Sequence, residues 1–456
     1  FGVLTLAWAL IGYAGLFDMG LGRALTQLVA KKLGSGESHE IPALAWTSLL
    51  LMLGLGMVGA AVIVAISPWL VHHALKIPEA LQLETLRAFY LLGLSVPVVI
   101  LTAGLRGLLE AHQRFKLVNA LRIPIGVFTF AGPLLVLPFS RSLAPVVGIL
   151  VVGRLTGCLA HLLACFWMVP ELRRRVAWHG PSAVPLLRFG SWMTVSNVVS
   201  PMMVYMDRFL IGALASMTAV AYYATPYEVV TKLLLFPAAL VGVMFPAFSA
   251  SFANDRSRAA LLFGRSVKYI LLALFPIILL IVAFAQQGLM LWLGADFARQ
   301  STRVVQWLAV GVLANSLALV PFCFVQGVGR PDLTAKLHLL ELPVYLGVLF
   351  WLVRTYGIDG AAIAWAARVS VDCILLFVVA RRLLPESSAG ILQILGVFAG
   401  AVSILAAAVV SVRPWFKLIA LLAALAGFGV AAWQFLLTPK EKAFIWHRNR
   451  PSLSAD

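Results

Sequence analysis

Apolar stretches long enough to cross a bilayer follow one another along the whole chain. A helix rises about 1.5 Å per residue, so roughly 20 apolar residues cross the ~30 Å hydrocarbon core of a membrane. The sequence predicts thirteen such spans, near residues 3–30, 43–70, 86–109, 118–138, 144–169, 187–214, 219–250, 267–293, 302–327, 334–353, 358–380, 390–411 and 415–437. With 62% hydrophobic and 12% charged residues, the chain is predicted to be an all-α, polytopic membrane protein.

The basic residues between the spans indicate an orientation. Alternate joints, at 31–32, 106–122, 173–188, 256–268, 330–336, 381–382 and 440–450, hold 22 Lys and Arg residues, and the opposite joints hold 8. Because cytoplasmic joints carry the excess of Lys and Arg, we expect the first set and the C-terminus in the cytoplasm. Much of the net charge of +17 is therefore an orientation signal, and no motif indicates a nucleic-acid partner.

An internal repeat divides the chain into two halves. The segment "NALRIPIGVF" is similar to "HLLELPVYLG", and Arg154 and Arg368 are followed by a proline 16 and 17 positions later. The repeated spans are six apart, so the halves share one orientation. We expect two pseudo-symmetric six-helix lobes (1–169 and 186–383), two further transmembrane helices (389–437) and a cytoplasmic tail (438–456). The first half holds five spans, so an opening helix is expected before it, giving fourteen in all.

Motifs for catalysis are missing from the sequence. There is no GxxxxGK[ST], HExxH or GxSxG, and "GLGR" and "GVGR" match a phosphate loop only weakly. The cysteines, with no CxxC spacing, indicate packed thiols and no metal site; they are Cys158, Cys165, Cys323 and Cys373. We therefore predict neither an enzyme nor a cofactor. The GxxxG from Gly153 to Gly157 is attributed to chance in a glycine-rich chain.

Ten charged residues lie inside the predicted spans, where charge is costly. The bases are Arg23, Arg154, Arg208, Lys232 and Arg368, and the acids are Asp18, Asp207, Glu228, Glu341 and Asp372. The spacing of four allows Glu228 to meet Lys232, and Arg368 to meet Asp372, along one helix face. These groups form either internal ion pairs or the lining of a polar pathway, and we favour the pathway.

The expected roles follow from charge. All five bases are candidate ligands of an anionic substrate, since the Arg fork matches phosphate oxygens. Asp18, Asp207, Glu228 and Asp372 are candidates for coupling to H⁺ or Na⁺. Asp207 and Arg208 are adjacent and point about 100° apart. We expect Asp207 to face the cavity or a neighbouring helix and Arg208 to reach toward the outer interface.

Several stretches carry a resemblance to a known family. Residues 1–30, 189–233, "FPAFS" at 245–249 and "GVGRP" at 327–331 resemble the Wzx-type polysaccharide-biosynthesis flippases, in the superfamily that also holds the MATE exporters. The resemblance implies a two-lobed bundle in a bacterial inner membrane. It implies a lipid-linked oligosaccharide substrate, usually on undecaprenyl pyrophosphate, held in a cationic cavity and moved to the outer leaflet. Polysaccharide-assembly proteins are implied as partners.

Two alternatives stay open. A MATE-like exporter of organic cations is expected to have an acid-dominated cavity, whereas here five buried bases face five buried acids. A membrane-embedded glycan polymerase is expected to act from a large outer loop. The longest predicted outer joint runs only from about 71 to 85, which disfavours the polymerase.

Overall fold

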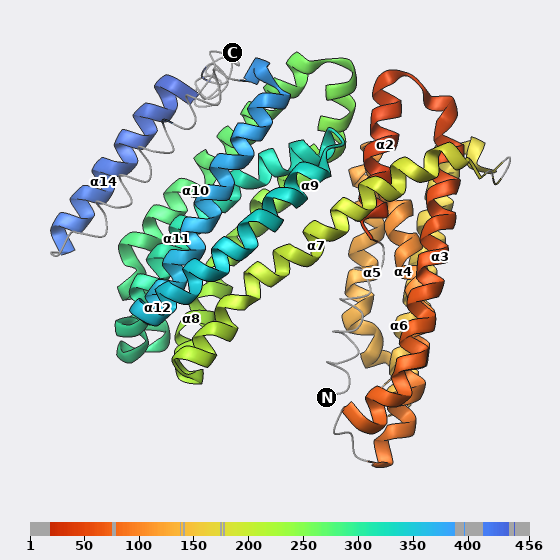
Figure 1. Cartoon of the computed structure of the whole chain (residues 1–456), viewed down its shortest axis with the longest axis horizontal. Helices are drawn as coiled ribbons and strands as arrows, with labels where there is room; N and C mark the ends of the chain where they lie inside the picture. The colour runs from red at the N-terminus through yellow and green to blue at the C-terminus, as the bar shows by residue number, and fades with distance from the viewer. Residues whose placement is uncertain are drawn as a thin grey trace, which may run out of the picture. The chain divides into compact units, whose positions relative to one another are not determined.

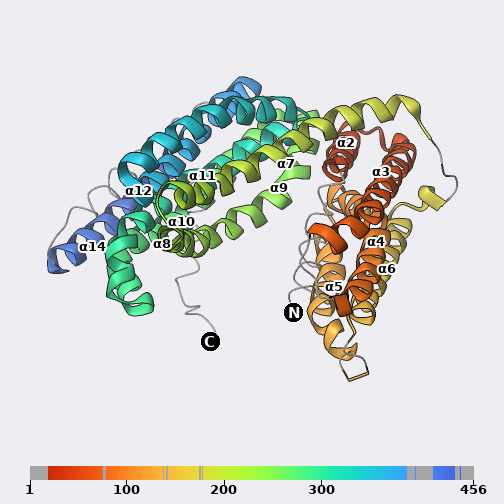
Figure 2. The same cartoon turned by 60° about the horizontal axis from the view of Figure 1, so that its bottom comes forward.

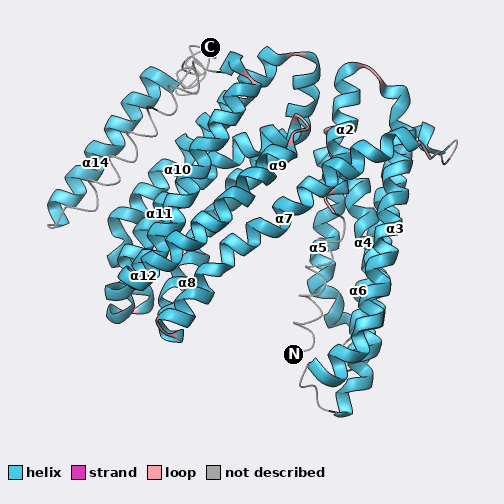
Figure 3. Cartoon of the chain, viewed as in Figure 1, coloured by secondary structure: helices cyan, strands magenta, loops and turns pink. Residues whose placement is uncertain are grey.

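The computed structural model describes residues 19–74, 79–136, 138–139, 142–173, 176, 178–387, 396, 414–436 and 442. Within these ranges the chain forms helices joined by short turns, and no strand is present (Figure 3). Eight helices in the described ranges are long and apolar enough to cross a membrane. The predicted all-α membrane class is confirmed, while the number thirteen stays a prediction.

The helices fall into two compact units. Unit 1 comprises residues 1–198, 245–255 and 326–335, and unit 2 comprises 199–244, 256–325 and 336–456. Each long helix α7 (Gly180–Leu214) and α9 (Leu235–Asn254) therefore contributes residues to both units. The predicted lobe borders, 1–169 and 186–383, stay a proposal.

Unit 1 is built around α2 (Leu21–Ser35), α3 (Ile41–Trp69), α4 (Glu79–Ala111), α5 (Phe115–Val136) and α6 (Leu143–Met168), which lie side by side in Figures 1 and 2. Short helical turns at Ser38–Glu40, Leu70–Ala74 and Pro170–Arg173 flank them. Glycines let the backbones approach: a Cβ on Gly56 of α3 would lie 2.6 Å from the Cα of Pro97 in α4. The close packing of α3 against α4 therefore depends on a glycine at position 56.

The GxxxG motif of α6 makes a helix contact after all. A Cβ on Gly153 would lie 2.6 Å from Cδ1 of Phe128, and one on Gly157 would lie 2.8 Å from Cδ1 of Ile125, both in α5. The attribution of this motif to chance was wrong. Both glycines lie one turn apart on the face that packs against α5, where small residues allow close approach.

Unit 2 contains α8 (Met217–Val230), the 3₁₀ turn Thr231–Leu234, α10 (Arg256–Leu293), α11 (Ala295–Gly327), α12 (Pro331–Leu383), the 3₁₀ turn Pro385–Ser387, α14 (Pro414–Ala431) and a π-helical turn at Ala432–Leu436. The predicted span 219–250 is thus divided between α8 and α9 by a 3₁₀ turn.

Helix α12 is two helices in one. Gly357 adopts a non-helical conformation with φ 58° and ψ −132°, and a Cβ on Gly360 would lie 2.0 Å from the carbonyl oxygen of Leu352. The chain therefore reverses at Gly357, and the two arms run back along each other (Figures 1 and 2). This confirms the two separate spans predicted at 334–353 and 358–380.

Candidate functional site

A polar cavity of about 390 Å³ lies inside unit 2, between α7, α8, α11 and α12. It brings together four of the predicted site residues, Arg208, Glu228, Arg368 and Asp372. The other lining residues are Ser200, Val204, Tyr205, Tyr227, Thr231, Leu234, Asn315, Ala318, Leu319, Phe322, His338, Trp365 and Leu376. The lining of the cavity therefore combines basic, acidic and aromatic side chains.

Arg208 lies at the centre of a small cluster of partners. Its Nη2 donates to Oε1 of Glu228 over 2.7 Å, and its guanidinium carbon lies 4.8 Å from the centroid of the Tyr227 ring and 5.2 Å from that of Tyr205. The Arg208 side chain is 18% exposed and that of Glu228 57%. The carboxylate and the aromatic faces hold Arg208 in the cavity, and its expected reach toward the outer interface stays a prediction.

Lys232 lies one turn after Glu228. Its Nζ is 3.9 Å from Oε2 of Glu228, which confirms the predicted contact at a spacing of four. The Lys232 side chain is 70% exposed, so this pair contributes little to stability. Lys232 does not line the cavity.

Arg368 makes an ion pair with a different acid from the one predicted. Its Nη1 lies 3.9 Å from Oε2 of Glu341, on the preceding arm of α12, and its guanidinium carbon lies 5.5 Å from the Tyr345 ring. Within the described ranges no ion pair joins it to Asp372, although the two interact electrostatically. A spacing of four permits contact but does not impose it, and here the reversal at Gly357 supplies a competing acid.

Asp207 is fully buried behind this cluster. Its Oδ2 accepts a hydrogen bond from the Tyr223 hydroxyl of α8 over 2.5 Å, and its Oδ1 accepts the backbone N–H of Arg208 over 2.6 Å. The expectation that Asp207 faces a neighbouring helix is confirmed. Both carboxylate oxygens have donors, so the buried acid is satisfied.

Three buried nitrogens of the lining have no hydrogen-bond partner in the described part of the protein: Trp365 Nε1, Arg368 Nε and His338 Nδ1. Indole and guanidinium N–H groups can only donate. Since buried donors in native proteins nearly always have an acceptor, these atoms favour a polar occupant of the cavity.

The remaining predicted bases lie in unit 1. Nη1 of Arg23, in α2, donates to Oε1 of Gln326 over 3.3 Å, and Nη1 of Arg154, in α6, donates to Ser95 Oγ over 2.9 Å. Each thus has a neutral partner on another helix. Asp18, predicted as a candidate for coupling to H⁺ or Na⁺, lies outside the described residues.

The site also contains residues that sequence reasoning missed. Glu341 counted among the buried charges but received no role, and its pairing with Arg368 depends on the fold of α12. Tyr227, His338 and Trp365 carried no signal, because an aromatic residue in an apolar span is ordinary. No group of three or more His, Cys, Asp or Glu side chains within the described ranges is placed to hold a metal ion.

Comparisons with known proteins place this geometry in context. The sequence profile of a family described as "Polysaccharide biosynthesis protein" matches residues 1–302. A putative O-antigen transporter of Shigella flexneri is 33% identical over 382 residues, which cover 82% of this chain and 88% of that protein. A probable low-salt glycan biosynthesis flippase of Haloferax volcanii is 24% identical over 195 residues, covering 42% and 41%.

Solved structures share the fold at low identity. A MATE structure in complex with MaD5 is 14% identical with a TM-score of 0.71, covering 85% of this chain and 88% of that one. A MOP superfamily transporter from Pyrococcus furiosus is 13% identical with a TM-score of 0.68, covering 84% and 88%. These likenesses show the transporter fold. The chain therefore belongs to the polysaccharide biosynthesis protein family, as the resemblance of its sequence implied, and has the fold of the MOP superfamily.

Proposed function

We propose that this multi-pass membrane protein is a flippase that carries a lipid-linked oligosaccharide from the cytoplasmic to the outer leaflet of a bacterial inner membrane. The observation that carries the proposal is the 33% identity to a putative O-antigen transporter across most of both chains. The polar cavity of unit 2, with two arginines in its wall, supports it. The carrier is proposed to be a polyprenyl pyrophosphate, whose charge needs cationic ligands in a membrane.

The proposed binding step is an exchange of anions at Arg208. In the structure the Glu228 carboxylate forms an ion pair with the Arg208 guanidinium, with 2.7 Å between Oε1 and Nη2. A phosphate presents several charged oxygens to the planar fork, and charge-assisted bidentate bonds are among the strongest hydrogen bonds in proteins. Because Glu228 is more than half exposed, it can turn toward water when a phosphate displaces it. Arg368 and the Trp365 indole are then placed to donate to the same headgroup.

The proposed roles of the other bases follow the same chemistry. Arg23, Arg154 and Lys232 are proposed to contact the headgroup or glycan at other stages of transport. Arg154, bonded only to a serine hydroxyl in the part of the chain that the structure describes, keeps most of its donors for a ligand.

Ion coupling is proposed at the acids. Glu341 and Asp372 interact with each other and share Arg368 as their neighbouring cation. Two carboxylates against one guanidinium leave a negative charge without compensation, and an H⁺ or Na⁺ can supply it. Asp207, Glu228 and Asp18 are further candidates. Binding of a cation in only one conformation shifts the balance between inward- and outward-open states.

The orientation is proposed from the basic joints, whose excess of Lys and Arg favours a cytoplasmic C-terminus. The lipid bilayer and the lipid-linked substrate are then the main partners, together with proteins that assemble the polysaccharide outside the membrane.

A second candidate is a MATE-like exporter of organic cations. The specific observation in its favour is the acidity around the cavity, where Glu228 and Asp372 line the wall and Glu341 lies behind Arg368. Transport of an organic cation such as ethidium, in place of the glycan lipid, is the outcome expected of this candidate.

Reconstitution in liposomes tests the proposal. The protein is expected to move a fluorescent polyprenyl-pyrophosphate oligosaccharide between leaflets, measured by quenching from the outer side. Arg208→Gln is expected to weaken headgroup binding, and Glu228→Gln to strengthen it, since the second change removes the internal competitor. Arg154→Ala and Arg368→Ala are expected to slow transport. Unchanged transport in all four variants removes these residues from the substrate path.

A further inference from the structure

Unit 1 contains a second cavity, of about 420 Å³, that the flippase proposal does not use. It lies between the end of α2, the first part of α7 and the loop joining α11 to α12, which contains the "GVGR" joint. Three bases line it, Lys31, Arg188 and Arg330, with the single acid Asp332. All three bases belong to joints predicted to be cytoplasmic.

The charge of this cavity is not balanced by its own acid. Asp332 is fully engaged with Arg330, whose Nε and Nη2 donate to its two oxygens over 2.9 and 3.1 Å. This contact raises the pKa of Arg330, which lies outside the membrane-spanning helices. Lys31 and Arg188 are exposed and make no side-chain ion pair or hydrogen bond to any residue that the structure places. Two positive charges therefore remain for a ligand.

A buried amide completes the polar wall. Gln27 is 3% exposed, lines the cavity and has no side-chain hydrogen bond within the described ranges. Gly329, at φ +87°, lies close against it, and a Cβ there would come within 3.1 Å of Gln27 Nε2. The N–H₂ of the Gln27 side chain can donate to an anionic oxygen in the cavity.

The loop is held in place by neighbouring helices of the same unit. Ser249 Oγ, in α9, donates to the Gly327 carbonyl over 2.6 Å, and Arg23 donates to Gln326 Oε1 over 3.3 Å. Gly329 N–H is bonded to the Gln326 carbonyl over 3.0 Å. The part of the lining that this loop supplies, with Arg330 and Asp332, is thus preorganised, which reduces the entropy lost on binding.

Part of the cavity lining is apolar. Leu28, Val184, Phe189 and Trp192 form this part, and Val184 is 69% exposed. A free inorganic anion gains nothing from these apolar residues, whereas a phosphate attached to a hydrocarbon chain gains from both the bases and the apolar residues. Tryptophan is also typical of the depth at which lipid headgroups meet hydrocarbon.

We propose that this cavity is a binding site for a lipid-borne phosphate ester on the cytoplasmic side, where Lys31, Arg188 and Gln27 hold the phosphate and the apolar lining residues, Trp192 among them, contact the first part of its chain. The side of the membrane rests on the proposed orientation. Two sources share this chemistry, a polyprenyl phosphate carrier and a glycerophospholipid headgroup.

Binding to the purified full-length chain in detergent tests the site. The probe is tritiated farnesyl phosphate, with farnesol, inorganic pyrophosphate and short-chain phosphatidylglycerol as competitors. The double variant Lys31→Gln/Arg188→Gln is expected to lose at least tenfold in affinity for the probe. The matched control Arg114→Gln/Lys116→Gln removes the same charge from another predicted cytoplasmic joint and is expected to bind normally. The swap Lys31→Arg/Arg188→Lys keeps the charge and is expected to restore binding, which separates lost binding from misfolding.

The competitors separate the sources. Displacement by phosphatidylglycerol supports a general phospholipid site, and its failure to displace the probe supports a site for the isoprenoid carrier. Equal binding by the double variant and its control, or displacement by pyrophosphate as effective as by unlabelled farnesyl phosphate, overturns the proposal. This binding assay does not depend on transport. If the protein binds the probe here but does not move the glycan lipid in the liposome experiment, the proposed function is refuted and the binding site is not.

Discussion

Asp207 shows how a membrane protein keeps an acid in its interior. The side chain is fully buried, yet each oxygen accepts a hydrogen bond, one from Tyr223 and one from the Arg208 backbone. The next residue, Arg208, points into the cavity and interacts with Glu228. The two adjacent charged residues thus lie in different surroundings and bind different partners, because successive side chains of a helix point about 100° apart.

The Tyr223 hydroxyl is expected to be needed for stability. Tyr223→Phe leaves one oxygen of a buried acid without its donor, and we expect a loss of about 1–3 kcal/mol in the free energy of unfolding. The measurement is thermal and denaturant unfolding in detergent, followed by tryptophan fluorescence. Tyr222→Phe is the control, since its hydroxyl makes no hydrogen bond within the described ranges. Equal effects of the two variants would show that the Asp207 contact is not stabilising.

Sequence reasoning found the charged residues of the cavity but not all their partners. The cost of charge in an apolar span identifies Arg208, Glu228, Arg368 and Asp372 without a structure. It does not tell which acid an arginine meets. Glu341 and Arg368 are 27 positions apart, and only the reversal of α12 brings them to 3.9 Å. Partners that depend on a distant turn are beyond spacing rules.

At the scale of the helices, close packing in unit 1 depends on particular glycines. Gly54 and Gly56 both lie in α3, but only Gly56 faces α4, with Pro97 2.6 Å from the place of its absent Cβ. A Cβ on Gly54 would meet nothing within 4 Å. Local sequence does not distinguish the two, since both glycines sit in the same apolar run, "LMLGLGMVG".

The two substitutions are expected to have opposite effects. Gly56→Ala forces α3 away from the α4 backbone and is expected to cost about 1–3 kcal/mol. Gly54→Ala is expected to be neutral or to stabilise by up to about 1 kcal/mol, because alanine has the better helix propensity. Unfolding midpoints of the two variants in one detergent provide the measurement, and a Gly56→Ala protein as stable as the parent contradicts the packing shown here.

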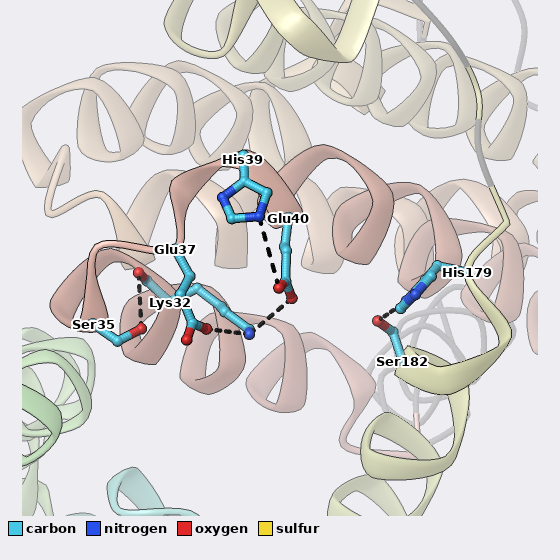
Figure 4. A network of polar contacts seen from close by, with 7 residues as sticks. All are labelled: Lys32, Ser35, Glu37, His39, Glu40, His179 and Ser182. Atoms are coloured by element: carbon cyan, nitrogen blue, oxygen red, sulfur yellow. Dashed lines mark hydrogen bonds and ion pairs between the residues drawn. The ribbon is translucent and has the colours of Figure 1, made fainter.

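The turn between α2 and α3 is held by Lys32, which interacts with Glu37 and lies 2.8 Å from Glu40 (Figure 4). These contacts raise the pKa of Lys32 and lower that of Glu37. The same figure shows His179 meeting Ser182, at the start of α7, over 2.7 Å. The α2–α3 turn is thus tied by ion pairs, and the start of α7 by a hydrogen bond between side chains.

The charged turn is expected to loosen at both ends of the pH scale. A lowered Glu37 pKa means that its contribution is present above the unfolded value of about 4.3 and is lost as the pH falls through the lower folded value. A raised Lys32 pKa means that its contribution is lost only as the pH rises above about 10.4.

Hydrogen exchange is the measurement for this turn. Protection of the Glu37 amide, bonded to the Lys32 carbonyl over 3.0 Å, is expected to stay level from about pH 5 to 9, after correction for intrinsic exchange, and to drop on either side. Lys32→Met should remove that dependence. If the variant keeps the parent's profile, the ion pairs do not hold the turn.

For the molecule as a whole, the sequence predicted the class better than the arrangement. Hydropathy alone indicates a helical membrane protein, because a bilayer permits few other structures. It does not indicate that α7 contributes to both compact units, or that residues 245–255 and 326–335 pack with the first helices. Those assignments depend on contacts between segments far apart in sequence.

Orientation is the prediction at this scale. In a chain whose four cysteines, Cys158, Cys165, Cys323 and Cys373, are replaced by alanine, single cysteines are introduced by Glu37→Cys and Asp296→Cys. A membrane-impermeant maleimide added to intact cells is expected to label residue 296 only, since the joint at residue 37 belongs to the basic, cytoplasmic set. Permeabilised cells, in which both label, are the control. Labelling of residue 37 alone would invert the orientation.

The contact between Arg208 and Glu228 has one more consequence for a protein bathed in salt. A guanidinium that already holds a tethered carboxylate at 2.7 Å offers little to chloride, because a halide makes one weak contact and must diffuse in from dilute solution. The resting transporter is therefore expected not to leak halides across the membrane. Discrimination among anions then arises because an incoming anion must compete with the Glu228 carboxylate for Arg208, and no narrow filter is needed.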